Sequence, residues 1–370
     1  MRQLSLTVLP GDGIGPEVMS AALAVLTATG QRFGFGFRFT HALIGARALS
    51  ETGRSLPVET LHACRANAAV LLGPVAGGKH VKTVPSNRPR EAVLKLRDWL
   101  GSYAAVRPIR SFAGLKANLP CHAPFDLVLI FDYSSGLYFG RPRGIVPSAE
   151  GYTATNTMVY TTTEVERVFR IACQIALRRQ RRILSVDQSK WLETGQLWSS
   201  TIEQKALELP NLSVSRRDAT HFFFELVNQT SRYDVIVSEM SIGLLAAAVA
   251  QGLSGAFAIH PVAYVGGETA VFQPSHGSGP HIAGRGVADP IGMIRAGALA
   301  LEMAFNEPRA AEAIETAVER TLAEGTMPQE LELTCSAATE NPQTTCCERL
   351  TAAIIRNLPD PVTKNDAPNH

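Results

Sequence analysis

Three glycines and two arginines are the residues whose chemistry stands out first in this sequence. Gly11, Gly13 and Gly15 follow an apolar segment, and glycine permits a positive φ and a close approach of the backbone to a ligand. Arg97 and Arg107 stand ten residues apart, and a guanidinium group can bind a carboxylate through two parallel hydrogen bonds. These residues alone leave open whether the turn binds a ligand or is merely tight, and whether the arginines bind an anion or lie at the surface.

The composition restricts the class of protein that carries this chemistry. The chain has 370 residues, of which 45% are apolar and 18% charged. It is therefore expected to fold as two or three domains and not to be disordered. The net charge of +2 indicates no nucleic-acid partner.

The sequence gives no sign of a membrane span or of a disulfide framework. The most apolar run, 242–259, contains Gln251, Ser254 and three glycines, which favours a buried helix. No cysteine pair has the C-x-x-C spacing, so we expect reduced thiols and a cytoplasmic location. The six cysteines are Cys64, Cys121, Cys173, Cys335, Cys346 and Cys347.

Short apolar strands alternate with amphipathic helices along the chain, and this alternation predicts an α/β fold. Helices are expected at 15–29, 163–178, 222–227 and 242–257. Strands are expected at 4–9, 69–72, 126–131, 182–187 and 233–238.

Several longer segments, taken together, make the glycine turn specific. They are LPGDGIGPEV (9–18), LKLRDWLGSYAAVRPIR (94–110), DLVLIFDYSSGLYFGRPRG (126–144), NTMVYTTTEVERVFRIA (156–172), SVDQSKWLETGQLW (185–198), YDVIVSEMSIG (233–243) and FQPSHGSGPHIAGRGVADPIGMI (272–294). In order and spacing the chain resembles the β-decarboxylating dehydrogenases of isopropylmalate, isocitrate, homoisocitrate and tartrate or malate, the isopropylmalate branch most. The resemblance runs from about residue 4 to about residue 320, and the last fifty residues depart from it.

This resemblance implies a two-domain α/β fold with a cleft between the domains. Residues 1–105 and 258–370 would form a first domain that carries the glycine turn and an adenosine-binding loop. Residues 106–257 would form a second domain, on the side of the substrate and of a twin subunit. The expected partners are a small carboxylic acid and a second copy of the chain, or a catalytic paralogue in a heteromer.

The resemblance also implies oxidation of a 2-hydroxy acid that carries a second carboxylate, followed by loss of CO2. Arg97 and Arg107 match two of the three substrate arginines of the family, whereas Phe131 stands at the position of the third. Arg90 replaces an acidic residue beside the substrate and adds a cation, unless it is a solvated surface residue. Tyr138 matches the catalytic tyrosine that donates a proton, with a packed aromatic residue as the alternative.

The base of the family is absent from its position. Gln188 follows Val186-Asp187, where the family has a lysine, and an amide cannot take up a proton. Lys190 lies two residues on and would share a face with Gln188 if the segment were extended. Lys190 is thus a candidate catalytic residue, with a solvated lysine as the alternative.

The metal ligands of the family are also replaced. Its three aspartates correspond to Thr220, Leu244 and Ala248, and a hard divalent cation needs oxygen ligands. From the sequence we therefore expect no divalent metal.

The cofactor loop is partly kept. Gly13 and Ile14 in the turn, with His276 and Gly277 in the loop, would bind the dinucleotide. Further candidates on the loop are His281, Arg285 and Asp289. His281 stands where NAD-type members have an aspartate, so NAD, NADP and a loop without cofactor all stay open.

Two functions compete at this point. The first is a divergent, metal-independent oxidoreductase or decarboxylase acting on a small di- or tricarboxylic acid with NAD(P). The second is a pseudoenzyme or regulatory subunit of a dehydrogenase paralogue, and a ligand sensor is a weaker variant of it. Binding of acids and dinucleotides would separate these functions from a cleft with no ligand.

Overall fold

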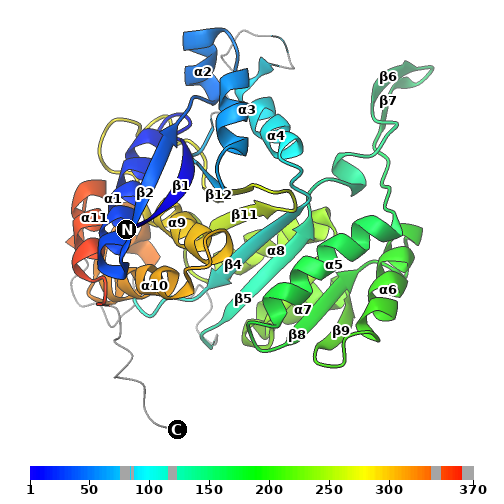
Figure 1. Ribbon diagram of the computed structural model, residues 1–370. Coiled ribbons are helices and arrows are strands. Elements are labelled where there is room, and N and C mark those ends of the chain that lie inside the picture. The colour runs from blue at the N-terminus through cyan, green and yellow to red at the C-terminus, as the bar shows by residue number, and fades with distance from the viewer. Residues whose placement is uncertain (76–83, 85–86, 116–122, 335–342, 361–370) are drawn as a thin grey trace.

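One sheet of ten strands extends through the whole molecule (Figure 1). The computed structural model describes residues 1–75, 84, 87–115, 123–334 and 343–360. The strand order is β2-β1-β3-β12-β11-β4-β5-β10-β8-β9. The strands are β1 (Arg2–Leu9), β2 (Phe35–His41), β3 (Ala69–Leu72), β4 (Ala104–Arg110), β5 (Asp126–Asp132), β8 (Arg182–Asp187), β9 (Ser213–Asp218), β10 (Val235–Ser238), β11 (Pro261–Val265) and β12 (Ala270–Pro274).

The two ends of this sheet are parallel and its centre is antiparallel. β11 runs antiparallel to both β12 and β4, and β4 runs antiparallel to β5. The remaining neighbours pair in parallel, as strand–helix–strand units require. The chain ends and the middle of the chain therefore occupy opposite ends of one sheet.

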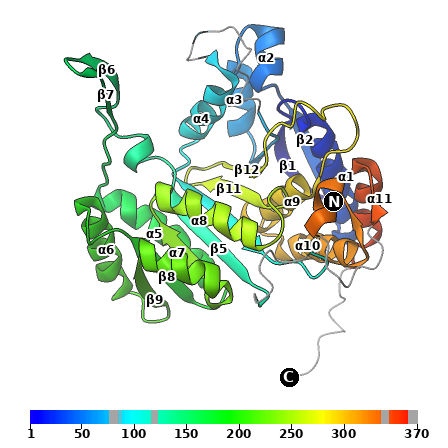
Figure 2. The ribbon, with the colours of Figure 1, turned by 180° about the vertical axis from the view of Figure 1, so that it is seen from behind.

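Helices cover both faces of the sheet (Figure 2). Against the end formed by β1, β2 and β3 lie α1 (Gly15–Phe33), α9 (Ile291–Met303), α10 (Pro308–Ala323) and α11 (Cys347–Arg356), with α2 (Gly45–Thr52), α3 (Val58–Arg65) and α4 (Pro89–Trp99) on the other face. Against the end formed by β8, β9 and β10 lie α5 (Thr162–Ala176) and α6 (Glu193–Ala206) on one face and α7 (Ala219–Asn228) and α8 (Met240–Leu253) on the other.

The alternation of apolar residues explains this layering. Leu6 and Val8 of β1 pack into the core beneath α1 and α9, whereas Leu9 packs with Leu72 and Leu96 on the side of α4. Successive side chains of a strand point to opposite faces, so a sheet covered on both sides needs apolar residues on both. The α/β fold is thus confirmed, while the proposed domain limits stay a prediction.

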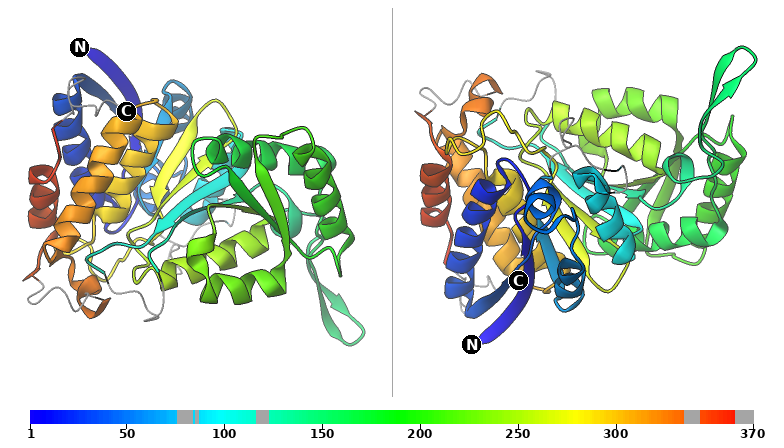
Figure 3. Two further views of the ribbon diagram at one scale, coloured as in Figure 1. Left: turned by 90° about the horizontal axis from the view of Figure 1, so that it is seen from below. Right: turned by 90° about the horizontal axis from the view of Figure 1, so that it is seen from above.

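Smaller elements complete the described chain. They are η2 (Gly136–Tyr138), η3 (Thr230–Arg232), η4 (Gln329–Thr334), β13 (Thr326–Met327), β14 (Gln343–Thr344) and the hairpin of β6 (Gly144–Ser148) and β7 (Gly151–Thr155). The hairpin projects away from the body of the molecule, and all its residues are exposed (Figure 3).

No helix in the described ranges is long and apolar enough to cross a membrane. The apolar run 242–259 begins inside α8, and Ile242 and Ala246 on that helix are buried. The four cysteines that the structure describes are free thiols: Cys64, Cys173, Cys346 and Cys347. Cys121 and Cys335 lie outside the described residues.

Candidate ligand-binding cleft

A cleft of about 960 Å³ lies between the first turns of α4, the segment after β5 and the start of α8. Five arginines line this cleft, and Glu91 is the one acidic residue among its described lining residues. The arginines are Arg88, Arg90, Arg107, Arg141 and Arg143. Clustered guanidinium groups with so little counter-charge favour an anionic ligand.

Arg107 is positioned by a central strand. It lies in β4, and its guanidinium carbon is 5.5 Å from the ring centre of Phe131 on the neighbouring β5. The Nε atom of Arg107 is buried and has no hydrogen-bond partner among the described residues. A buried donor without a partner is costly, so a carboxylate here would satisfy it.

Arg97 lies outside the lining of the cleft. Its side chain is buried, Nη1 donates to the hydroxyl of Tyr133 at 2.6 Å, and Nη2 donates to Oε1 of Gln273 at 2.7 Å. Arg97 is thus held behind the lining of the cleft, and its role in substrate binding stays a prediction. The sequence could not show that Tyr133 and Gln273 bind Arg97, because both residues are far from it along the chain.

Tyr138 does lie in the cleft. It ends the short helix η2, its side chain is 43% exposed, and Arg143 donates to its carbonyl oxygen. The preceding turn is held by Asp132, whose Oδ2 accepts from the backbone N–H of Ser135 at 2.7 Å. Burial raises the pKa of Asp132 to about 6, although the backbone donors of the turn oppose this shift.

The position of the third arginine is filled by an apolar side chain. Phe131 is fully buried and packs in one cluster with Met240 and, at its edge, Leu244. A Cβ atom on Gly243 would come within 2.4 Å of the Phe131 ring, so α8 approaches β5 closely here. One wall of the cleft is therefore apolar and close-packed.

Within a single chain, Lys190 does not line this cleft. The segment after β8 is a turn, in which the N–H of Trp191 donates to the carbonyl of Gln188 at 3.0 Å. The extended segment that would place Lys190 on the face of Gln188 is therefore absent, and both side chains are exposed. A catalytic role for Lys190 stays a prediction without support from the single chain.

The glycine turn and the expected cofactor loop are joined through their backbones. The N–H of Ile14 donates to the carbonyl of Ser278 at 2.8 Å, and Gly13 has a φ of 61°. Nε2 of His276 is buried without a described partner, and a Cβ on Gly277 would meet only open space. An unsatisfied ring nitrogen beside an open backbone fits the adenosine part of a dinucleotide.

Three other cofactor candidates lie elsewhere. His281 is exposed, and Arg285 lines a separate groove between α1 and α11 beside Cys346. Asp289 is buried, and its Oδ1 accepts from the N–H of Ile291 at 2.8 Å. Asp289 thus binds the first N–H of α9, and its role toward a cofactor stays a prediction.

Buried Asp289 and exposed Glu330 are neighbouring carboxyl groups with a consequence for stability. Burial and the charge of Glu330 raise the pKa of Asp289, and partial loss of water raises the pKa of Glu330. Carboxyls whose pKa is raised on folding stabilise the native state fully below their unfolded pKa of about 4. This stabilisation is lost as the pH rises through the raised values.

Replacing Glu330→Gln should therefore reduce the loss of stability between acidic and neutral pH. Gln keeps a hydrogen-bonding side chain but removes one of the two titrating groups. Urea unfolding at a series of pH values measures the effect, with Glu312→Gln, at an exposed position of α10, as the control. Equal pH dependence in both variants would show that the pair does not titrate as described.

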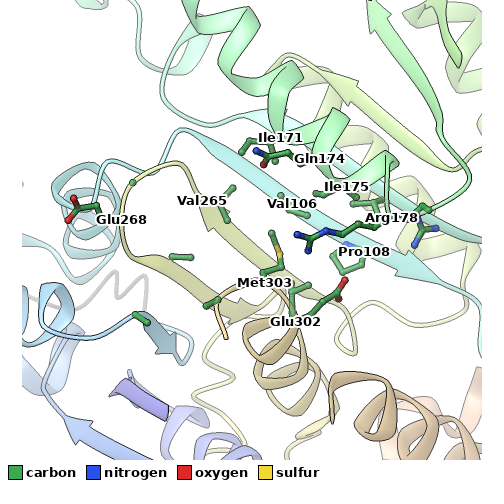
Figure 4. A pocket seen from close by; sticks show the side chains of 17 residues that line it. Val106, Pro108, Ile171, Gln174, Ile175, Arg178, Val265, Glu268, Glu302 and Met303 are labelled. Carbon is green, nitrogen blue, oxygen red and sulfur yellow. The ribbon is translucent and has the colours of Figure 1, made fainter. Parts of the chain in front are cut away.

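A second hollow lies on the opposite face of the sheet (Figure 4). This groove of about 450 Å³ is lined by Val106 and Pro108 of β4, Val265 of β11 and, on α9, Glu302. Burial raises the pKa of Glu302, although two nearby arginines act against it. Arg107, between Val106 and Pro108, faces the cleft instead, because side chains alternate along a strand.

The geometry so far defines an α/β protein whose sheet has helices on both faces, with a cleft lined by arginines and a loop joined to the glycine turn. Residues 5–351 match the family model described as isocitrate/isopropylmalate dehydrogenase. The chain belongs to that family. The isopropylmalate/isocitrate dehydrogenase-like fold predicted from the motifs is therefore confirmed.

Individual relatives agree with this assignment. The 3-isopropylmalate dehydrogenase of Moorella thermoacetica is 40% identical over 325 residues, which cover 86% of this chain and 91% of the relative. That of Aquifex aeolicus is 35% identical over 88% of this chain and 90% of the relative. The isocitrate dehydrogenase of Methylococcus capsulatus superposes with a TM-score of 0.83 at 29% identity, over 96% of this chain and 99% of the other.

Membership of the family corrects the expectation that no divalent metal is needed. The family reaction draws on NAD and on a divalent metal ion, and this chain matches the family along almost its whole length. The side chains of Thr220, Leu244 and Ala248 nevertheless supply no carboxylate. The described residues also contain no cluster of three His, Cys, Asp or Glu side chains that could hold a metal. We therefore derive no step through a metal ion, and Mg2+ is included in every measurement of ligand binding below.

Proposed function

We propose that this member of the family binds a small di- or tricarboxylic acid in the cleft, as the substrate of an NAD-dependent oxidoreductase. The main support is the lining of the cleft, which among its described residues contains five arginines and one acidic residue. Arg107 adds a buried Nε without a described partner, which a carboxylate would satisfy. These features support a ligand with more than one negative charge.

The residues of this chain have separate tasks in the proposal. Arg107 holds one carboxylate from the sheet, while Arg90 and Arg141 attract the others at the mouth of the cleft. Tyr138, also in the lining, presents its hydroxyl group as a hydrogen-bond donor to the ligand. NAD, when bound at His276, supplies the hydride acceptor. The apolar wall at Met240 and Leu244 excludes water from the ligand.

Calorimetric titration with isopropylmalate, isocitrate and citrate, each with Mg2+ and NAD, tests this proposal. We expect at least one acid to bind with a stoichiometry of about one per chain, and monocarboxylic acids such as acetate to bind much more weakly. A protein that binds none of the multivalent acids would contradict the proposed function.

A subunit that binds the acid without oxidising it is the second candidate. The observation that favours it is Gln188, because an amide at the position of the family's base cannot accept a proton. The two candidates differ in one readout. Both outcomes are measured with Mg2+ or Mn2+ present. If NAD is reduced to NADH when the acid binds, the protein is an enzyme. If the acid binds and no NADH forms, the protein is a non-catalytic subunit.

We also propose that the chain forms a dimer through the hairpin and through α7 and α8. Ile145 and Tyr152 on the hairpin are 72% and 79% exposed, and Phe224 on α7 is 69% exposed. Large apolar side chains are seldom left in water on an isolated two-stranded hairpin. A second copy of the chain would cover them.

Replacing Tyr152→Glu is accordingly expected to shift the protein from dimer to monomer in sedimentation velocity. The added charge would have to be buried in the interface, and burying an unpaired charge is costly. Val58→Glu, on α3 at the other end of the sheet, is the matched control and should leave the dimer intact. A Tyr152→Glu protein that remains dimeric would exclude this interface.

A further inference from the structure

Two tyrosines and two arginines form one contact set at the base of the cleft. Tyr264 of β11 and Tyr133, directly after β5, meet edge to face with ring centres 4.6 Å apart. The guanidinium carbon of Arg97 lies 3.5 Å from the ring centre of Tyr264 and 4.9 Å from that of Tyr133. Arg107, on the neighbouring strand β4, lines the cleft together with Tyr264.

The two tyrosines occupy different electrostatic environments. Burial alone would raise the pKa of Tyr264, which is 3% exposed, but the charges of Arg97 and Arg107 outweigh it and lower this pKa. Burial raises the pKa of Tyr133, and Arg97 opposes that rise only in part. The pair therefore releases its first proton from Tyr264, and Tyr133 stays a neutral phenol.

Among the described residues, the charged groups that act on Tyr264 are Arg97 and Arg107, and both are positive. On the β12 side Arg97 is held by the neutral amide of Gln273, and from α8 the cleft is lined by Met240 and Leu244. The one acidic residue of the described lining, Glu91, lies on α4. Positive charge thus dominates the surroundings of Tyr264.

We propose that Tyr264 is the proton acceptor of the cleft, and that an anionic ligand on Arg107 binds together with a proton that Tyr264 takes up. This rests on the proposed function, because it requires an anion at Arg107. A carboxylate there offsets the positive charge that favours the phenolate, so the phenolate gains affinity for a proton when the ligand binds.

The proton comes from solvent and ends on the phenolate Oη of Tyr264, which lines the cleft, so the anion binds beside a neutral phenol.

The first experiment titrates the tyrosinate absorption of the full-length protein without ligand. The chain has seven tyrosines, and an ordinary phenol titrates near pH 10. We expect one tyrosine to ionise below that value in the parent protein, and this early step to vanish in Tyr264→Phe. Tyr152→Phe, on the exposed hairpin, should keep it. Arg107→Gln should move the early step to higher pH if the variant folds.

The second experiment measures proton uptake on binding. Citrate is titrated into the protein, with Mg2+ and NAD present, in two buffers of different ionisation enthalpy, above the pH of the early step. We expect uptake of about one proton per citrate in the parent protein and none in Tyr264→Phe. Citrate binding without proton uptake, or an early step that survives in Tyr264→Phe, would overturn the inference and leave the proposed function standing. If citrate does not bind but another acid of the panel does, the measurement is made with that acid. If no acid binds, both the inference and the proposed function are overturned.

Discussion

The Arg107→Met variant should bind its acid about 2–3 kcal/mol more weakly than the parent protein, a loss of roughly 30- to 150-fold in affinity. Arg107 lies in β4 at the base of the cleft, and its half-buried guanidinium cannot be replaced by an arginine from the mouth. Met keeps much of the aliphatic stem that packs there, so the change removes mainly the charge. Calorimetry with the strongest-binding acid of the panel, with Mg2+ and NAD present, measures the loss.

Arg170→Met is the matched control, because it removes the same charge from an exposed position of α5 outside the cleft. Its affinity should equal that of the parent protein apart from a small effect of net charge, which added salt suppresses. Equal losses in both variants would mean that only long-range charge attracts the acid. An unchanged affinity in Arg107→Met would place the anion site elsewhere.

The Gly13→Ala variant should lose both stability and dinucleotide binding. Gly13 has a φ of 61°, which costs an L-residue about 1–2 kcal/mol. Its new Cβ atom would also lie 2.0 Å from the carbonyl oxygen of Ser278, and relieving such overlap costs about a further 1–3 kcal/mol. Relief requires the loop that begins at His276 to move, so binding of NAD should weaken as the free energy of unfolding falls.

Gly34→Ala separates the two causes. Gly34 ends α1 with a φ of 80°, but a Cβ there would meet nothing within 4 Å. Denaturant unfolding should therefore show only the backbone cost in Gly34→Ala and a clearly larger cost in Gly13→Ala. NAD binding should be normal in the first variant. If the two variants were equally stable and bound NAD equally, the contact between the turn and the loop would have no energetic role.

Fewer than half of the regular elements were predicted from the sequence, and those are the ones with strong apolar periodicity. The strands expected at 69–72 and 182–187 have those same limits in the structure. Helix ends were less certain. The helix expected from Thr163 begins at Thr162 because Thr161 and Glu164 form a reciprocal cap, and α8 begins two residues before Ile242 because Glu239 caps it.

The site was predictable only where local sequence decides the position of a side chain. Arg107 and Tyr138 reach the cleft because the strand and the short helix that carry them are set by their own segments. Arg97 does not, because residues far along the chain bind it. For Lys190 the sequence did not reveal the turn that replaces the expected extended backbone.

The tyrosine pair is the feature that sequence reasoning missed altogether. Tyr133 and Tyr264 are separated by more than a hundred residues, and each looks like an ordinary aromatic residue at the end or centre of a strand. Only the pairing of β4 with both β5 and β11 brings them against the same arginines. Arg141 and Arg143 were within reach, since they follow Tyr138 directly in the motif GLYFGRPRG.

The alternation of β4 has a mechanical consequence. Arg107 faces the cleft while its neighbours Val106 and Pro108 face the groove behind it, so the two hollows are separated by a wall one backbone thick. On the neighbouring strand β11, Tyr264 likewise faces the cleft and Val265 faces the groove. A substitution that shifts the backbone of β4 or β11 would therefore reshape both hollows at once.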